Sequence, residues 1–153
     1  MEELLPGKFK KNDPTLLQQY IEKEKNEFGG YRDIRIWVYR NHQTNKPEFF
    51  GAYYRNAPPN QFLTNISQNG FATPFPEIDR KLQVYSQYIL DAAKGDVAGI
   101  DFACDSDGRY WFEEINTDFE TGEQSLEILG DGIWKKAVDL AEARAFRKEY
   151  MVT

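Results

Sequence analysis

The stretch 99–116 holds the side chains best suited to chemistry in this chain. The runs 97–104 and 110–115 are rich in aromatic and β-branched residues, which favours strands, and residues 105–108 (DSDG) are turn-forming types. The segment therefore predicts a β-hairpin. Within its otherwise apolar strands lie three oxygen-bearing side chains: Asp101, Glu114 and Asn116.

Alternation along a strand decides which of these oxygens can act together. Side chains two residues apart share a face, so Glu114 and Asn116 point one way. By the same rule, Glu113 and Ile115 point the other way. If strand pairing brings Asp101 to the face of Glu114, two carboxylates and an amide oxygen converge, a set that suits Mg²⁺. A slip of one residue would separate them, and the alternative is that these acids are merely solvated, as acids near a turn usually are.

The same hairpin also matches part of a calcium-binding loop. Asp105, Asp107, Gly108 and Glu114 have the spacing of EF-hand positions three, five, six and twelve. Position one would then be Ala103, which has no ligand oxygen in its side chain, and the flanking residues predict strands where an EF-hand has helices. We therefore exclude an EF-hand.

The bulk properties are those of a folded, acidic chain. Its 153 residues, 41% hydrophobic and 15% aromatic, suffice for a core, so we expect one domain over 1–153. No apolar run could cross a bilayer, and the start MEELLPGKFKK is neither a secretion signal nor a transit peptide, which predicts a cytoplasmic protein with no membrane role. The net charge of −6 with scattered basic residues disfavours nucleic-acid binding. The same negative charge is compatible with ATP binding if Mg²⁺ neutralises the phosphates of ATP.

Three further extended segments precede the hairpin. Residues 16–21 (LLQQYI) predict a buried strand leading into a charged loop. Residues 33–40 (DIRIWVYR) alternate with period two, and 47–55 is the expected antiparallel partner. The polar stretch 56–76 is longer than an ordinary connection, which is typical of a binding loop, although a plain surface loop remains the alternative.

Two amphipathic helices complete the expected fold. In 78–94 the apolar residues Leu82, Tyr85, Ile89 and Ala93 recur at helical spacing, and 133–151 is a second helix. We expect both to pack on one face of the sheet, which gives an α+β fold with an antiparallel β-sheet backed by helices. The chain offers no Ser-His or Cys-His pair for covalent catalysis, because the only histidine and cysteine lie apart in unpromising places.

In this order the elements resemble the C-terminal part of an ATP-grasp ligase, of the kind that includes the ribosomal-protein glutamate ligases and glutathione synthetases. The resemblance spans roughly 15–122 and rests on several motifs in the family's order. These are LLQQYIE for the hinge strand, GGYRDIRIWV for the D-x-R strand, GAYYRNAPPNQFLTNISQNG for the arginine-to-asparagine loop, and AGIDFACDSDGRYWFEEIN for the aspartate strand and E-x-N motif.

The resemblance implies a role for each matching residue. Asp101, Glu114 and Asn116 would hold Mg²⁺, with Mn²⁺ as a substitute, bridging the phosphates of ATP. The hinge residues Gln19, Tyr20 and Ile21 would flank the adenine, largely through backbone atoms, and Asp33 would lie near the ribose. The catalytic residues would be Arg35, Arg55 and Asn65. The two arginines would face the transferring phosphate or the substrate carboxylate, and the amide of Asn65 would assist from the loop.

The implied reaction joins a carboxylate substrate to an amine acceptor, a small molecule or a peptide, through an acyl phosphate. Leu63 departs from the pattern, since many relatives have an arginine there, and Thr117–Gly122 replaces a common Pro-Gly turn. The upstream domain and the flap with its phosphate-binding lysines are not recognisable before Thr15, so a missing domain or a separate chain would complete the site. The rival function is a noncatalytic interaction or regulatory module that keeps the fold.

Overall fold

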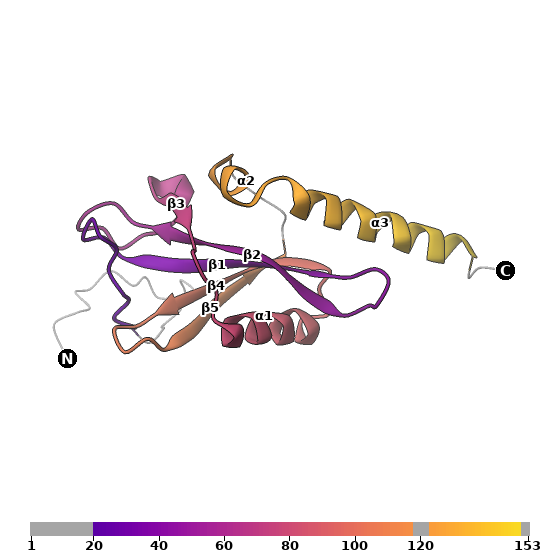
Figure 1. Ribbon diagram of the computed structural model, residues 1–153, viewed down its shortest axis with the longest axis horizontal. Coiled ribbons are helices and arrows are strands. Elements are labelled where there is room, and N and C mark those ends of the chain that lie inside the picture. The colour runs from indigo at the N-terminus through magenta and orange to yellow at the C-terminus, as the bar shows by residue number, and fades with distance from the viewer. Residues whose placement is uncertain (1–19, 118–122, 151–153) are drawn as a thin grey trace, which may run out of the picture.

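A computed structural model describes residues 20–117 and 123–150, and in that part of the chain five strands form one antiparallel sheet in the order β3-β2-β1-β4-β5 (Figure 1). The elements are β1 (Arg32–Arg40), β2 (Pro47–Asn56), the 3₁₀ turn η1 (Ile66–Gln68), β3 (Phe71–Pro74), α1 (Arg80–Ala92), β4 (Val97–Cys104), β5 (Tyr110–Asn116), α2 (Glu123–Leu129) and α3 (Gly132–Tyr150). The α+β fold expected from the sequence is confirmed. Among the described helices, none is long and apolar enough to span a membrane.

The central strand β1 sets the register of the whole sheet. It pairs with β2 on one side, where Asp33 lies opposite Arg55. On its other side it pairs with β4, where Arg35 lies opposite Asp101. Because side chains alternate, all four of these charged residues project from the same face of the sheet.

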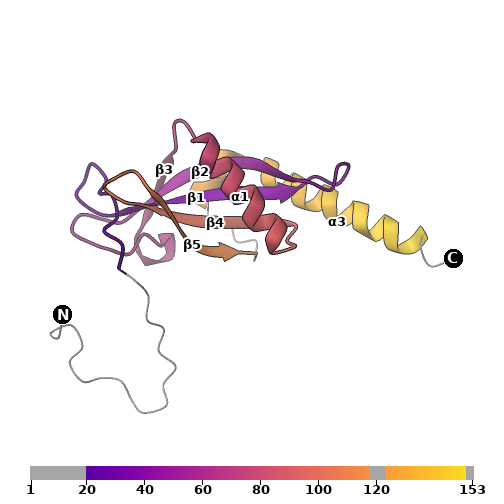
Figure 2. The ribbon, with the colours of Figure 1, turned by 90° about the horizontal axis from the view of Figure 1, so that it is seen from below.

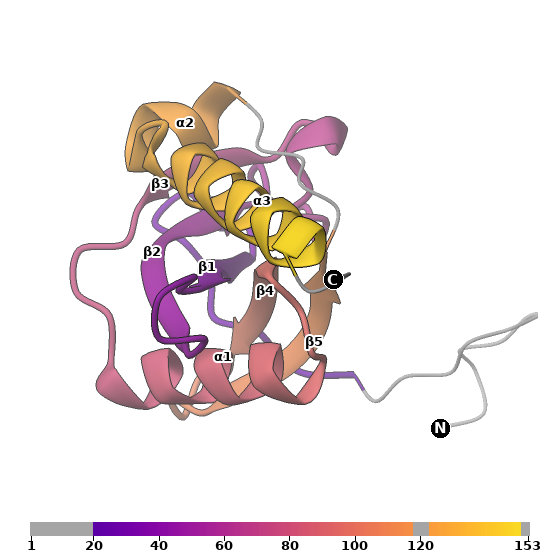
Figure 3. The same cartoon turned by 90° about the vertical axis from the view of Figure 1, so that its right-hand side faces the viewer.

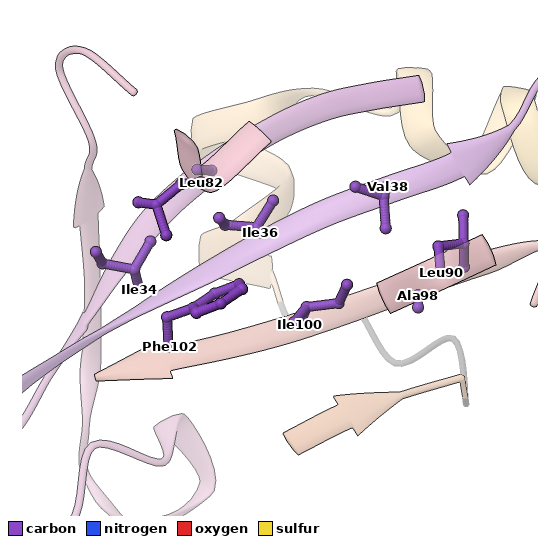
Figure 4. Close-up of a cluster of buried hydrophobic side chains, with 9 residues drawn as sticks. Ile34, Ile36, Val38, Leu82, Leu90, Ala98, Ile100 and Phe102 are labelled. Carbon is purple, nitrogen blue, oxygen red and sulfur yellow. The ribbon is translucent and has the colours of Figure 1, made fainter. Parts of the chain in front are cut away.

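The opposite face carries the larger hydrophobic core. Ile34, Ile36 and Val38 of β1 lie beside Ile100 and Phe102 of β4, as Figure 4 shows. All five are at most 2% exposed. Burial of each such side chain contributes about 1.5–3 kcal/mol relative to leaving it in water. The period-two alternation of 33–40 places Ile34, Ile36 and Val38 together on this face.

Helix α1 covers this core with a face other than the expected one. Its buried residues are Leu82, Ser86 and Leu90, spaced four apart, whereas Tyr85 is 50% exposed and Ala93 is exposed. The prediction of Tyr85 and Ala93 as core positions was therefore wrong. A helix advances about 100° per residue, so a small buried serine between two leucines continues the inner stripe that a search for apolar residues alone misses.

Helix α3 lies on the other face, which corrects the expectation that both helices share one face (Figure 3). In Figure 2 α1 lies in front of the sheet and α3 behind it. The reason is a second apolar cluster of Trp37, Tyr39, Tyr53, Val97 and Ile133. The four residues of this cluster that belong to strands cover one end of the second face, and Ile133 of α3 packs on them. The other end of that face is the charged region described below.

The two described residues of the segment 16–21, Tyr20 and Ile21, do not form the buried strand that the sequence predicted. Tyr20 and Ile21 lie outside any strand, and Tyr20 is 64% exposed, while residues 16–19 lie outside the described residues. Only isolated bridges follow, from Lys23 to Asp105 and from Lys25 to Tyr31. Residues 23–25 therefore lie between the start of β1 and the end of β4.

Candidate functional site

The candidate site is the charged half of the second sheet face. Asp33, Arg35, Arg55 and Asp101 each have less than a tenth of their surface exposed. Their positions follow from the period-two alternation of β1, β2 and β4, which turns the intervening residues into the core. Buried charges at this density must be paired with one another or with a ligand.

Asp101 lies at the centre and is held by both arginines. Arg35 donates through Nε to Oδ1 and through Nη2 to Oδ2, the latter at 2.8 Å. Arg55 adds a contact from Nη2 to Oδ2 at 2.7 Å. The planar, two-pronged pairing fixes the guanidinium group of Arg35, and the contact through Nη2 orients that of Arg55. The sequence placed all three residues in the site, and the structure brings them into contact.

Arg55 also reaches the loop 56–70 and retains an unused donor. Its Nη1 donates to Oδ1 of Asn65 at 3.5 Å, and its Nη2 lies 3.7 Å from Oδ2 of Asp33. Its Nε atom is buried and has no hydrogen-bond partner among the residues that the structure describes. Since a buried N–H without an acceptor is costly, this atom marks a position where an acceptor oxygen of a ligand would be favourable.

Glu114 lies directly opposite Asp101 in the pairing of β4 with β5. The two carboxyl groups are within hydrogen-bonding reach: burial raises the pKa of Asp101 to about 6, and a hydrogen bond from Asp101 lowers the pKa of Glu114. Asn116 Nδ2 donates to Glu114 Oε1 at 3.0 Å. The three oxygen-bearing side chains thus meet on one face, the arrangement that the register had to provide.

This donor set fits a hard divalent cation. Two carboxyl groups in contact need a positive charge between them, and without a metal a proton takes that place. Glu114 is exposed on the edge strand, where its carboxyl is reached by solvent as well as by Asn116, whereas both oxygens of Asp101 already accept from guanidinium groups. Within the described residues, no group of three or more His, Cys, Asp or Glu side chains could hold a metal; the candidate set includes only two carboxylates and relies on an amide and water.

The expectation that Glu113 faces away with Ile115 was wrong. The pairing of β4 with β5 shifts by one residue between Asp101 and Phe102, so Glu113 is an extra residue in β5. Its Oε1 accepts an ion pair from Lys23 Nζ at 2.6 Å, and the same amine lies 2.6 Å from Asp33. Glu113 therefore reaches the charged face, because a β-bulge turns two successive side chains to one side.

Asp33 is a second hub, next to the first. It pairs with Lys23, and the buried hydroxyl of Thr64 donates to its Oδ2. Lys23, Glu113 and Thr64 were missed by sequence reasoning. Lys23 belongs to a charged run that reads as a solvated loop, and a bulge leaves no simple sequence signal.

Tyr20, one of the residues expected at the nucleotide base, belongs to an exposed aromatic cluster beside this hub. The ring of Tyr20 stacks on Phe62 with centroids 6.1 Å apart, and Tyr31 meets Phe62 edge-on at 5.2 Å. Ile21 is half-buried, and Gln19 lies outside the described residues. Leu63, next to Phe62, is 53% exposed, so the loop presents an apolar side chain where relatives were expected to carry a charge.

Comparison with solved structures supports the fold. The D-alanine-D-alanine ligase from Coxiella burnetii matches with a TM-score of 0.53 and 16% identity over 88% of this chain. The ATP-grasp ligase PsnB, complexed with its minimal precursor, matches with a TM-score of 0.50 and 14% identity over 79% of this chain. This chain covers 36% of each of those structures, so it spans about a third of their length. No curated protein matches its sequence.

The sequence itself matches a protein family over most of its length. The YheC/D-like ATP-grasp family matches residues 1–95, which include β1, β2 and the loop between β2 and β3. Those elements contribute Asp33, Arg35, Arg55 and Asn65 to the charged face. The chain therefore belongs to the YheC/D-like ATP-grasp family.

Proposed function

We propose that this chain is the nucleotide- and cation-binding part of an ATP-dependent carboxylate-amine ligase, within the branch that resembles the ribosomal-protein glutamate ligases and glutathione synthetases. The observation that carries the proposal is the convergence of Asp101, Glu114 and Asn116 beside two buried arginines. Membership of an ATP-grasp family supports this reaction class. We propose that residues 1–153 form a single domain of a cytoplasmic enzyme.

Glu114 and Asn116 would hold Mg²⁺, or Mn²⁺ in its place, and Asp101 would join them by exchanging a guanidinium contact for the cation. A bound dication supplies charge that offsets the repulsion between phosphate oxygens and an incoming carboxylate. An arginine released from Asp101 stays on the same face. It can then pair with a phosphate or carboxylate oxygen in the two-pronged geometry it now shows to Asp101.

The proposed reaction has two steps. A carboxylate oxygen attacks the γ-phosphorus of ATP, the bond between the β- and γ-phosphates breaks, and ADP leaves. An amine then attacks the acyl carbon, the bond from carbon to the phosphate oxygen breaks, and the amine proton passes to solvent. Arg35 and Arg55 would stabilise the negative charge on the transferring group, and the unused Nε of Arg55 offers a ready donor.

The remaining roles follow the order of the elements. Gln19, Tyr20 and Ile21 would flank the adenine, Asp33 would approach the ribose, and Asn65 would assist from the loop, where it now bonds to Arg55. An upstream domain or a separate chain would close over this face. The acceptor is a small molecule or a peptide amine.

Titration of Mg²⁺·ATP followed by NMR tests the proposal. Asp101→Asn removes the partner of two buried arginines and would disturb the fold, so Glu114→Gln is the better variant. Asp107→Asn, an exposed acid in the hairpin turn, is the matched control. We expect wild type and the control to bind alike and Glu114→Gln to bind at least about tenfold more weakly. Equal binding by all three would refute the cation site.

A noncatalytic module is the second candidate function. Leu63 favours it, because the loop has an apolar side chain where many relatives were expected to have an arginine. Adding candidate partner chains with carboxylate and amine substrates, and following ADP release, distinguishes the two. Turnover supports the ligase. If Mg²⁺·ATP binds normally but no partner or acceptor yields ADP, the binding-module function stands instead.

A further inference from the structure

Lys23 is the least exposed amine at the candidate site. Its Nζ lies 2.6 Å from Oδ1 of Asp33 and 2.6 Å from Oε1 of Glu113, and its side chain is 10% exposed. The amine also lies over the ring of Phe62, 5.4 Å from the centroid. Three partners from β1, β5 and the loop thus enclose one charge.

The amine of Lys23 lies between two parts of the site: the segment expected to meet the base and the strand β5, which carries cation donors. Lys23 follows Ile21 by two residues, so it belongs to the segment expected to meet the base. Glu113 directly precedes Glu114, so it belongs to the strand that carries the cation donors. The bridge crosses β4 near Ala103, a fully buried small residue opposite Asp33.

Ala103 lies two residues from Asp101 along β4, on the same face of the sheet. Residues two apart along a strand are roughly 6–7 Å apart, so the position on β4 that the bridge crosses is about that far from Asp101. The segment 20–22 and the donors on β5 are therefore joined through a single side chain. A ligand that meets both must span the distance that this side chain fixes.

We propose that Lys23 and Glu113 form a positioning pair that sets the separation between the base-binding segment 20–22 and the cation donors Glu114 and Asn116. This inference rests on the proposed function. Neither residue touches the reacting atoms. Without Lys23, Glu113 would lose its ion-pair partner beside Asp33, which would keep only Thr64 and the 3.7 Å contact with Arg55. Repulsion between these two acids and the desolvation of Glu113 would move the segment away from β5.

The pair makes nucleotide binding, but not binding of the cation alone, depend on the spacing between segment 20–22 and β5, and this difference can be measured. In wild type we expect Mn²⁺ to broaden the amide signals of Glu114 and Asn116, and Mg²⁺ with a nonhydrolysable ATP analogue to shift those of Tyr20–Glu22. In Lys23→Met we expect the Mn²⁺ response to remain, while affinity for the nucleotide falls by about tenfold to a hundredfold, as for other groups that orient ligands.

Controls separate position from stability. Lys25→Met removes a nearby exposed amine that lies over Tyr31, and it should bind like wild type. Lys23→Arg should recover part of the lost affinity, because it keeps the charge. If Lys23→Met fails to fold, Glu113→Gln keeps the volume, weakens the same bridge and should show the same split between nucleotide and Mn²⁺.

The outcomes distinguish the two proposals. Nucleotide affinity unchanged in a folded Lys23→Met overturns the positioning pair and leaves the ligase function intact. Loss of the Mn²⁺ response together with the nucleotide also overturns it, since Lys23 would then support the cation donors themselves. If wild type shows no Mn²⁺ response at Glu114 and Asn116, the proposed function fails and the positioning pair fails with it.

Discussion

Glu114 lies directly opposite Asp101, and the pairing of β4 with β5 shifts by one residue immediately beyond this pair. Because of that shift, two successive glutamates project from the charged face instead of one. Glu114 meets the carboxyl of Asp101, and Glu113 meets the amine of Lys23. A single bulge thus supplies one acid to the cation donors and another to the segment expected to bind the base.

Removing the charge of Asp101 should destabilise the fold far more than removing that of Glu114. Asp101→Asn leaves Arg35 and Arg55 buried without their shared anion, and we expect the free energy of unfolding to fall by about 3–5 kcal/mol. Glu114→Gln changes an exposed edge residue and should cost less than about 0.5 kcal/mol. Urea denaturation of both variants measures the difference. Similar losses would show that Asp101 is not the centre of the buried charge network.

Cation binding should weaken as the pH falls through about 6. Burial raises the pKa of Asp101 from 3.8 to about 6, so the folded state binds this proton more tightly than the unfolded chain does. The stability contributed by this bound proton is therefore fully present below about pH 3.8 and lost as the pH rises through about 6, above which Asp101 is paired with Arg35 and Arg55 as an anion.

A cation competes for the same place, so affinity for Mn²⁺ at about pH 5 should be roughly tenfold lower than at about pH 7.5. Calorimetry at the two pH values measures this ratio. The same affinity at both would show that Asp101 takes no part in holding the cation.

The turn before β1 should depend on Asn26. Its Nδ2 donates to Ala57 O, and its Oδ1 accepts from the backbone N–H groups of Phe28 and Gly30, each at 3.0 Å. Asn26→Ala leaves buried backbone groups unpaired and should cost about 1–3 kcal/mol in the free energy of unfolding. Glu27→Ala, exposed in the same turn, is the control. Faster hydrogen exchange at Gly30 should accompany the loss, and equal stability of the two variants would contradict it.

Restoring a charge at Leu63 should strengthen nucleotide binding. The side chain is 53% exposed, so Leu63→Arg should fold normally. It would add a cation to the loop, directly before Thr64, which contacts Asp33. One extra charge near a phosphate contributes up to about 1 kcal/mol in water, so we expect affinity for Mg²⁺·ATP to rise about threefold at low salt. High salt should abolish the gain, and Leu63→Gln should show none. No gain at low salt would place the phosphates away from this loop.

Much of the site followed from the period-two alternation of strands. That pattern correctly indicated the shared face of Glu114 and Asn116 and the two-sided character of β1. Whether Asp101 joins Glu114 depended on the register of β4 with β5, which alternation alone leaves open. The pattern failed at Glu113, because the bulge depends on how β5 meets its partner and not on the residues of β5 alone. It also missed Lys23, whose burial is a tertiary effect.

Helix placement was less predictable than helix existence. Both long helices were expected and found, yet α1 buries Ser86 in place of Tyr85, and α3 packs on the opposite face. The apolar side chains Trp37, Tyr39 and Tyr53 create that second packing surface. Their alternation shows which face they share, but not which helix covers them.

The position of a bound Mn²⁺ ion is the most direct test of the cation site. Paramagnetic broadening in NMR spectra reports which amides lie near the ion, and the hairpin offers its own internal comparison. We expect the signals of Asp101, Glu114 and Asn116 to broaden at lower Mn²⁺ concentrations than those of the exposed turn 105–108. Broadening that begins at the turn and leaves Glu114 sharp would contradict a cation site on the charged face.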